Sequence, residues 1–203
     1  MEQFETWKIK DHEIEFFDDT HTYICDGIIQ PSITQILKVK FSNKYQGISK
    51  ATLDHASTLG TQMHLAIQEF EEHGIDCELK ELRNYKFLKR QYKWECIENE
   101  TPVILFQDDE PIACGRIDMV GLIDDKMGIF DFKRTSTLDK EYLAYQLNLY
   151  RLAYQQCYES EIEFLRGIHL REDVRKFVQI PINEQMAWNL VDEYMKGAKD
   201  GNL

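Results

Sequence analysis

The sequence lacks the cysteine patterns of compact metal sites and of disulfide-stabilised secreted proteins. Its 5 cysteines are odd in number and scattered over positions 25, 77, 96, 114 and 157. No Cys-x-x-Cys pair is present to suggest structural zinc or redox chemistry. We therefore expect free thiols in a reducing compartment, the cytoplasm.

Long hydrophobic runs and linker-like segments are also missing. The longest apolar stretches have the length of strands, as in residues 101–106, and the N-terminus is charged from Glu2 onward. We therefore expect neither a membrane helix nor a signal peptide, and no membrane partner. With 203 residues, 43% hydrophobic content and only 4 prolines, the chain is expected to form a single domain over residues 1–203.

The chain also lacks an excess of positive charge. The net charge is −12, which argues against a simple nucleic-acid binder because phosphate contacts normally require excess Lys and Arg. Two basic clusters remain, and each could contact nucleic acid or form an ordinary solvated face. They are Lys38, Lys40, Lys44 and Lys50, and Lys86, Lys89, Arg90 and Lys93.

Periodicity and turn residues predict the order of the elements. Two short strands are expected over residues 13–29, in an N-terminal β-hairpin region spanning residues 1–30, before the core of residues 31–203. Ser32 and Gln35 fit a capping box at the start of a helix. Further helices are predicted over residues 49–73, 79–94, 138–158 and from Asn183, and strands over residues 97–106, 112–123, 128–133, 164–170 and 177–182.

Two predicted neighbouring strands carry a concentration of charge. Alternation places Asp131 and Lys133 on one face of their strand and Phe130 and Phe132 on the other. The hairpin turn at residues 124–126 brings Asp118 opposite residues 131–133. Cross-strand side chains lie about 5 Å apart, so two carboxylates there could share a divalent ion. The alternative is a partly buried ion-pair network without catalytic duty.

Five short motifs follow one another along the chain. They are Gly60-Thr-Gln-Met-His64, Glu100-Thr-Pro-Val103, Gly115-Arg-Ile-Asp118, Asp131-Phe-Lys133, and Gln146 with Tyr150. Together with Pro31-Ser-Ile-Thr-Gln-Ile-Leu37, they resemble the motifs of the PD-(D/E)XK nuclease superfamily, specifically its RecB-like branch of phage and mitochondrial exonucleases. The resemblance runs from about Pro31 to Tyr154.

The resemblance implies a fold, an activity and partners. The fold would be α/β, with a restriction-endonuclease-like αβββαβ core whose mixed β-sheet is flanked by helices. The activity would be that of a metal-dependent DNA exonuclease, acting on single-stranded DNA or duplex ends in recombination, repair or phage DNA metabolism. It would work in the cytoplasm of a bacterium or phage-infected cell, with a helicase or recombination protein as partner. The iron–sulfur cluster of some members is not expected, because four clustered cysteines are missing.

The resemblance also implies residue roles. His64, Asp118, Asp131 and the backbone carbonyl of Phe132 would bind one or two Mg²⁺ or Mn²⁺ ions. Lys133 would orient and help deprotonate the attacking water, and Asp118, Asp131 and Glu100 would complete the catalytic set. Glu98 lies two residues before Glu100 on the same predicted face, so it could serve instead, or both could be solvated.

Five residues are candidates for substrate binding. Gln146 and Tyr150 share a helix face, and Arg134, Thr135 and Ser136 directly follow the catalytic strand, where they could contact the DNA backbone. Tyr150 could instead be a core residue, and Arg134, Thr135 and Ser136 could be solvated loop residues. Likewise, His64 could be a core histidine and Gly60 a helix-packing residue. A second hypothesis, motivated by the acidic charge, is a catalytically degenerate DNA-binding module on the same scaffold.

Overall fold

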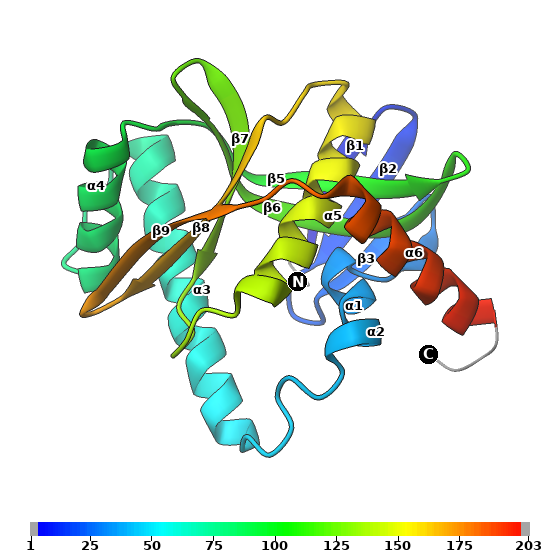
Figure 1. Ribbon diagram of the computed structural model, residues 1–203, viewed down its shortest axis with the longest axis horizontal. Helices are drawn as coiled ribbons and strands as arrows, with labels where there is room; N and C mark the ends of the chain where they lie inside the picture. Colours follow the sequence, from blue (N-terminus) through cyan, green and yellow to red (C-terminus); the bar gives the residue numbers. More distant parts are fainter. Residues whose placement is uncertain (1–3, 200–203) are drawn as a thin grey trace.

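The computed structural model describes residues 4–199 and contains two β-sheets (Figure 1). The first is an antiparallel four-stranded sheet of β1 (Phe4–Ile9), β2 (His12–Phe17), β3 (Thr22–Cys25) and β4 (Ile28–Gln30). The prediction of two strands and a hairpin was incomplete. The positive φ angles of Asp26 (51°) and Gly27 (79°) form a tight turn that separates β3 from β4.

The second sheet has five strands in the order β5-β6-β7-β8-β9. They are β5 (Glu95–Gln107), β6 (Glu110–Ile123), β7 (Lys126–Lys133), β8 (Phe164–Arg171) and β9 (Val174–Ile180). The central strand β7 pairs antiparallel with β6 and parallel with β8. Because parallel neighbours need a crossover, helix α5 (Lys140–Tyr158) connects them. The predicted α/β fold with a mixed sheet is confirmed at this level.

The other helices mostly begin and end where the sequence predicts. They are α1 (Ile33–Ile36), α2 (Lys38–Phe41), α3 (Lys50–His73), α4 (Lys80–Tyr92) and α6 (Glu184–Lys199). The Ser49 side chain accepts the Thr52 N–H at the start of α3, and Gly74, with φ 68°, ends it. The capping box was wrong: within residues 4–199 the Ser32 hydroxyl makes no cap hydrogen bond, and pairs instead with the Thr34 hydroxyl.

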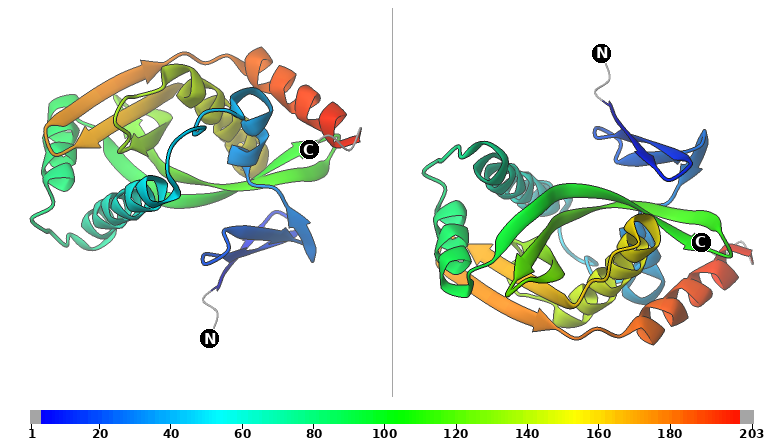
Figure 2. Two further views of the ribbon diagram at one scale, coloured as in Figure 1. Left: turned by 90° about the horizontal axis from the view of Figure 1, so that it is seen from below. Right: turned by 90° about the horizontal axis from the view of Figure 1, so that it is seen from above.

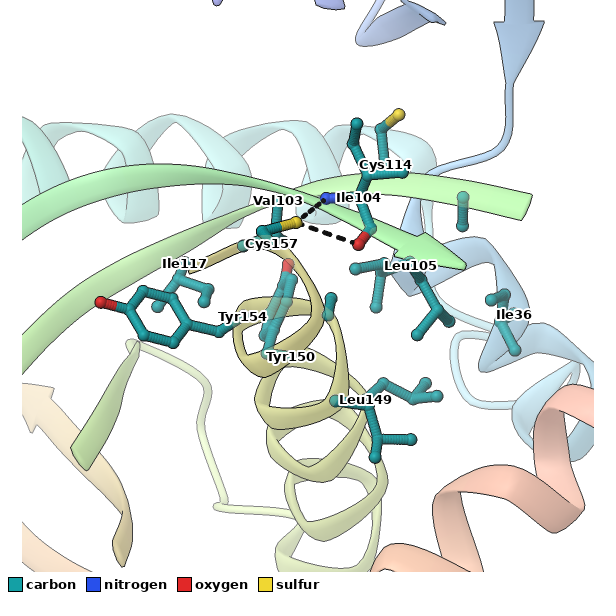
Figure 3. Packing of buried hydrophobic residues seen from close by; sticks show 14 of the residues in the cluster. Ile36, Val103, Ile104, Leu105, Cys114, Ile117, Leu149, Tyr150, Tyr154 and Cys157 are labelled. Atoms are coloured by element: carbon teal, nitrogen blue, oxygen red, sulfur yellow. Dashed lines mark hydrogen bonds between the residues drawn. The ribbon is translucent and has the colours of Figure 1, made fainter. Parts of the chain in front are cut away.

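The helices bury the two faces of the five-stranded sheet in separate cores. Helix α5 packs on one face, where Ile104, Leu147 and Tyr150 belong to the larger core (Figure 3). Helices α3 and α4 cover the other face, where Met63, Tyr85, Phe130 and Phe132 form the smaller core. The strand β7 is therefore covered on both faces, and any charge on it must be paired inside the protein.

The N-terminal sheet packs against the long β5–β6 hairpin, on the side opposite α5 (Figure 2). On the α5 side, the buried Cys157 thiol accepts the Ile104 N–H at 3.1 Å and lies 3.2 Å from the Ile104 carbonyl oxygen (Figure 3). All five cysteines lie among the described residues as free thiols. Within residues 4–199, no helix combines the length and apolar character required to cross a membrane.

Candidate metal centre

The candidate site lies where the β6–β7 ladder opens. Regular pairing ends at Met119 and Phe130. Beyond that pair, the Asp118 Oδ2 atom accepts the backbone N–H of Phe132 at 2.6 Å, so a carboxylate replaces the partner strand's carbonyl. Asp118 therefore faces residues 131–133, as the hairpin predicts.

Asp131 and Lys133 form an ion pair on the face opposite Phe130 and Phe132. Asp131 is only 1% exposed, and the Lys133 Nζ atom lies 2.8 Å from its Oδ1 and 2.6 Å from its Oδ2. Within the described residues, the buried Oδ2 has no partner besides this ion pair. Burial raises the pKa of Asp131 to about 6, although Lys133 opposes the rise. Burial disfavours the charge on Lys133, but Asp131 and Asp118 outweigh it and raise its pKa.

His64 reaches the same point from α3 and is surrounded by oxygen atoms. Its Nε2 donates to the Phe132 carbonyl at 3.2 Å, and its Nδ1 lies 3.6 Å from Asp118 Oδ1 and 3.7 Å from Glu100 Oε1. Burial disfavours the imidazolium, yet Asp118 and Glu100 raise the pKa of His64 to about 9. These neighbours distinguish His64 from an ordinary core histidine.

The backbone decides between Glu98 and Glu100. Glu100 has a φ of 48° in the middle of β5, a left-handed conformation that breaks the alternation of side chains. Its carboxylate lies beside His64, and its Oε2 is 2.7 Å from Arg116 Nε. Glu98 instead accepts a hydrogen bond from Thr101 and lies near Tyr154. Burial is the main cause that raises the pKa of Tyr154 to about 12, and the charge of Glu98 adds to it. The prediction that both acids share one face was therefore wrong, and Glu100 is the acid at the site.

The donor set suits a hard divalent cation. Ligand atoms of His64, Glu100 and Asp118 all lie within 4.8 Å of one another, and the buried Oδ2 of Asp131 is a further oxygen donor. Carboxylate oxygens are preferred by Mg²⁺, and an added imidazole nitrogen favours Mn²⁺. The Phe132 carbonyl, also predicted as a ligand, accepts from His64 here. The residues present therefore fit the expected ion.

Gln146 and Tyr150 lie one turn apart on α5, and Tyr150 is a neighbour of the acids. Both are buried, at 5% and 6% exposure, and within the described residues the Gln146 Oε1 has no hydrogen-bond partner. Burial, together with Tyr23, Asp118 and Asp131, raises the pKa of Tyr150. Tyr150 also belongs to the larger core, so it is both a packing residue and a neighbour of the acids.

Two glycines of the predicted motifs differ in their surroundings. A Cβ on Gly115 would lie 2.9 Å from Tyr150 Cε1, so the absence of a side chain lets Tyr150 approach β6. A Cβ on Gly60 would meet no described atom within 4 Å. Packing therefore accounts for Gly115 but not for Gly60, which faces open space.

The segment after Lys133 is only partly available to a substrate. Arg134 was predicted to contact DNA, but its Nε lies 2.7 Å from Oε1 of Glu81, which is 2% exposed. This ion pair holds Arg134 against α4, and its contact with DNA stays a prediction. Thr135 and Ser136 are exposed. The Thr135 hydroxyl donates to the Thr137 carbonyl, and the Thr135 carbonyl accepts a hydrogen bond from His169 Nε2 on β8.

The predicted basic clusters are largely engaged in ion pairs. Lys86 pairs with Asp76 and Lys89 with Glu71, each at 2.5 Å. In the other cluster, Lys40 and Lys44 each lie 3.2 Å from an acid near the start of α5, Glu141 and Asp139 respectively. These four lysines therefore stabilise contacts between elements.

Arg116 is a site residue that the sequence reasoning missed. It stands two residues before Asp118 on β6, so strand alternation, which places both on one face, could have identified it. Its guanidinium binds Glu100, pairs with Glu5 at 3.1 Å, and lies 5.0 Å from the Phe16 ring centre. Arg116 thus connects the acidic cluster to the N-terminal sheet.

Comparison with known proteins adds little to this picture. No protein-family model matches the chain, and no curated protein sequence is detectably similar to it. Among solved structures, the chain is similar to the crystal structure of SSO0001, with a TM-score of 0.47 and 16% sequence identity over 82% of this chain and 75% of that one. A likeness this distant carries no argument about function.

Proposed function

We propose that this protein is a divalent-metal-dependent DNA nuclease with a restriction-endonuclease-like core. The order α3, β5, β6, β7, α5, β8 is consistent with that core. The observation that carries the proposal is the meeting of Asp118, Asp131 and Lys133 where the β6–β7 ladder opens, with His64 and Glu100 beside them. Such a concentration of partly and fully buried charge is costly unless it has a function or an ion.

The residues divide into ligands and a charge-balancing cation. His64, Glu100, Asp118 and Asp131 would hold Mg²⁺ or Mn²⁺, which when bound polarises a phosphoryl oxygen and lowers the pKa of a bound water. Lys133, fixed by Asp131, would stabilise the negative charge that develops on the phosphate oxygens during attack. From the same position Lys133 would orient the attacking water and help to deprotonate it.

The proposed substrate is single-stranded DNA or the ends of duplex DNA, and the proposed mode is exonucleolytic. A helicase or recombination protein would be the partner. The proposed substrate contacts come from residues that surround the acids. Gln146 and Tyr150 would reach a phosphate of the DNA, or Lys133, from α5. The buried Gln146 Oε1 has no hydrogen-bond partner among the described residues and is free for such a contact. The exposed hydroxyls of Thr135 and Ser136 would bind the DNA backbone next to Lys133.

The test is digestion in Mn²⁺ of end-labelled linear, circular and duplex DNA. We expect Lys133→Ala to lower the rate by about 10²–10³-fold, the loss seen when one transition-state donor is removed, while keeping the fold. Lys126→Ala is the matched control, because Lys126 lies on the same strand with a side chain 64% exposed. Resistance of circular DNA would identify exonuclease action.

Two results would contradict the proposal. One is wild-type protein that binds no Mn²⁺ by calorimetry and leaves both single and double strands intact. The other is equal cleavage by wild type and Lys133→Ala. DNA binding that persists in EDTA without any cleavage would instead support the non-catalytic DNA-binding module.

A further inference from the structure

A cavity of about 730 Å³ adjoins the candidate metal centre. Its walls come from the N-terminal sheet and from α3, and His64, Glu100 and Arg116 form its inner end. This volume lies in the range of pockets that hold small ligands. The proposed metal and phosphate chemistry does not use the rest of the cavity, so its lining requires a separate explanation.

Two large apolar side chains are exposed in this lining. Phe4 from β1 and Leu65 from α3 are each 54% exposed. The Phe4 ring is already stacked on Phe17, with centroids 5.6 Å apart and planes at 21°. Phe4 is therefore held as a flat apolar surface beside the site, and such surfaces favour planar aromatic ligands.

The charge of the lining argues against a phosphate as the ligand. Among the described residues, it carries the carboxylates of Glu5, Asp18 and Glu100 against Arg116 and His64. Arg116 is already paired with Glu5 and Glu100, so little positive charge is available. A nucleobase fits these groups better, because carboxylates accept hydrogen bonds from exocyclic amino groups and aromatic rings stack on bases.

We propose that this cavity binds the unpaired base of the nucleotide next to the scissile phosphate, stacked against Phe4 and Leu65, with its polar edge toward Glu5 and Asp18. The inference rests on the proposed nuclease function and specifies its substrate. A base can enter such a cavity only when it is unstacked and unpaired. The protein should therefore act on single strands or frayed ends in preference to intact duplex.

The test compares oligonucleotides of one length and one sequence, either intact or carrying abasic sites. With intact single strands in Mn²⁺, Phe4→Ala should raise KM about tenfold, the effect expected for the loss of one base–aromatic stack, whereas Phe4→Trp should leave KM unchanged. Leu65→Ala should also raise KM, because it removes apolar surface from the opposite wall of the cavity. Abasic strands should be poor substrates for wild type and should erase the difference between wild type and Phe4→Ala. Ile29→Ala is the control, since Ile29 is 71% exposed on the same sheet but does not line the cavity.

Binding of the same strands in Ca²⁺, measured by fluorescence anisotropy, separates the two proposals. If wild type cleaves but Phe4→Ala and Leu65→Ala match it in KM and affinity, or if abasic strands are equally good substrates, the base pocket is wrong and the nuclease proposal stands. If wild type cleaves nothing, the nuclease proposal fails. The binding loss in Phe4→Ala would then still support the base pocket, and unchanged binding would refute it.

Discussion

The chemistry of His64 depends on its neighbours rather than on its own helix. Its ring faces the carboxylates of Asp118 and Glu100, which raise its pKa to about 9 against the opposing effect of burial. A proton on His64 then balances negative charge that a divalent ion would otherwise balance. Binding of an ion and binding of this proton should therefore compete.

The raised pKa predicts how stability depends on pH in EDTA. Unfolded His64 loses its proton near pH 6.5 and folded His64 near pH 9. Its stabilising contribution is therefore complete below pH 6.5 and is lost as pH rises toward 9. Urea unfolding midpoints of the wild type should fall over this interval, and His64→Gln should flatten the fall. His55→Gln, an exposed histidine on the same helix, should behave as wild type; an equal fall in His64→Gln would contradict the prediction.

At the scale of elements, the contact between β6 and α5 sets the position of Tyr150. A Cβ on Gly115 would lie 2.9 Å from the Tyr150 ring and 3.1 Å from Ile33 Cδ1. We expect Gly115→Ala to destabilise the protein by about 1–3 kcal/mol, as overpacked cores do, and to lower activity by displacing Tyr150. The free energy of unfolding in urea checks this. Gly60→Ala, whose Cβ would meet no described atom within 4 Å, is the control, and equal stability of the two variants would contradict the argument.

The elements differ in how well the sequence predicts them. Alternation of side chains along β6 and β7 suffices to bring Asp118 opposite residues 131–133, because hairpin pairing is local. Strand β1 was missed because four of its first five residues are exposed, so that only Trp7 and Ile9 mark an inward face. Ser32 and Gln35 match a capping box, but a helix of only four residues follows.

Two features of the site have no local signal in the sequence. The left-handed backbone at Glu100 breaks the alternation of side chains along β5. That alternation was the reason to expect Glu98 and Glu100 on the same face. Arg134 is bound by Glu81, 53 residues away, and only the packing of α4 against the sheet brings that partner near. Periodicity predicts the strands, whereas a single residue's φ angle and a long-range ion pair depend on the complete fold.

At the scale of the molecule, the acidic charge would oppose binding of the proposed DNA substrate. The chain has a net charge of −12, and the proposed site adds buried carboxylates where the phosphate must approach. Like charges facing each other cost several kcal/mol. Because Ca²⁺ would neutralise the acids, we expect it to raise the affinity of Lys133→Ala for single-stranded DNA at least about tenfold over EDTA. Fluorescence anisotropy measures this, and equal affinity in both buffers would favour the non-catalytic module.

The parallel pairing of β7 with β8 also sets the order of events during synthesis. Asp131 is opposite Gly167 in that register, and α5 lies between the two strands in sequence. Until the ribosome has released β8, β7 is an unprotected edge and Asp131 remains hydrated. A nascent chain therefore carries the acids before it can bury them, and the site is complete only when β8 has joined the sheet.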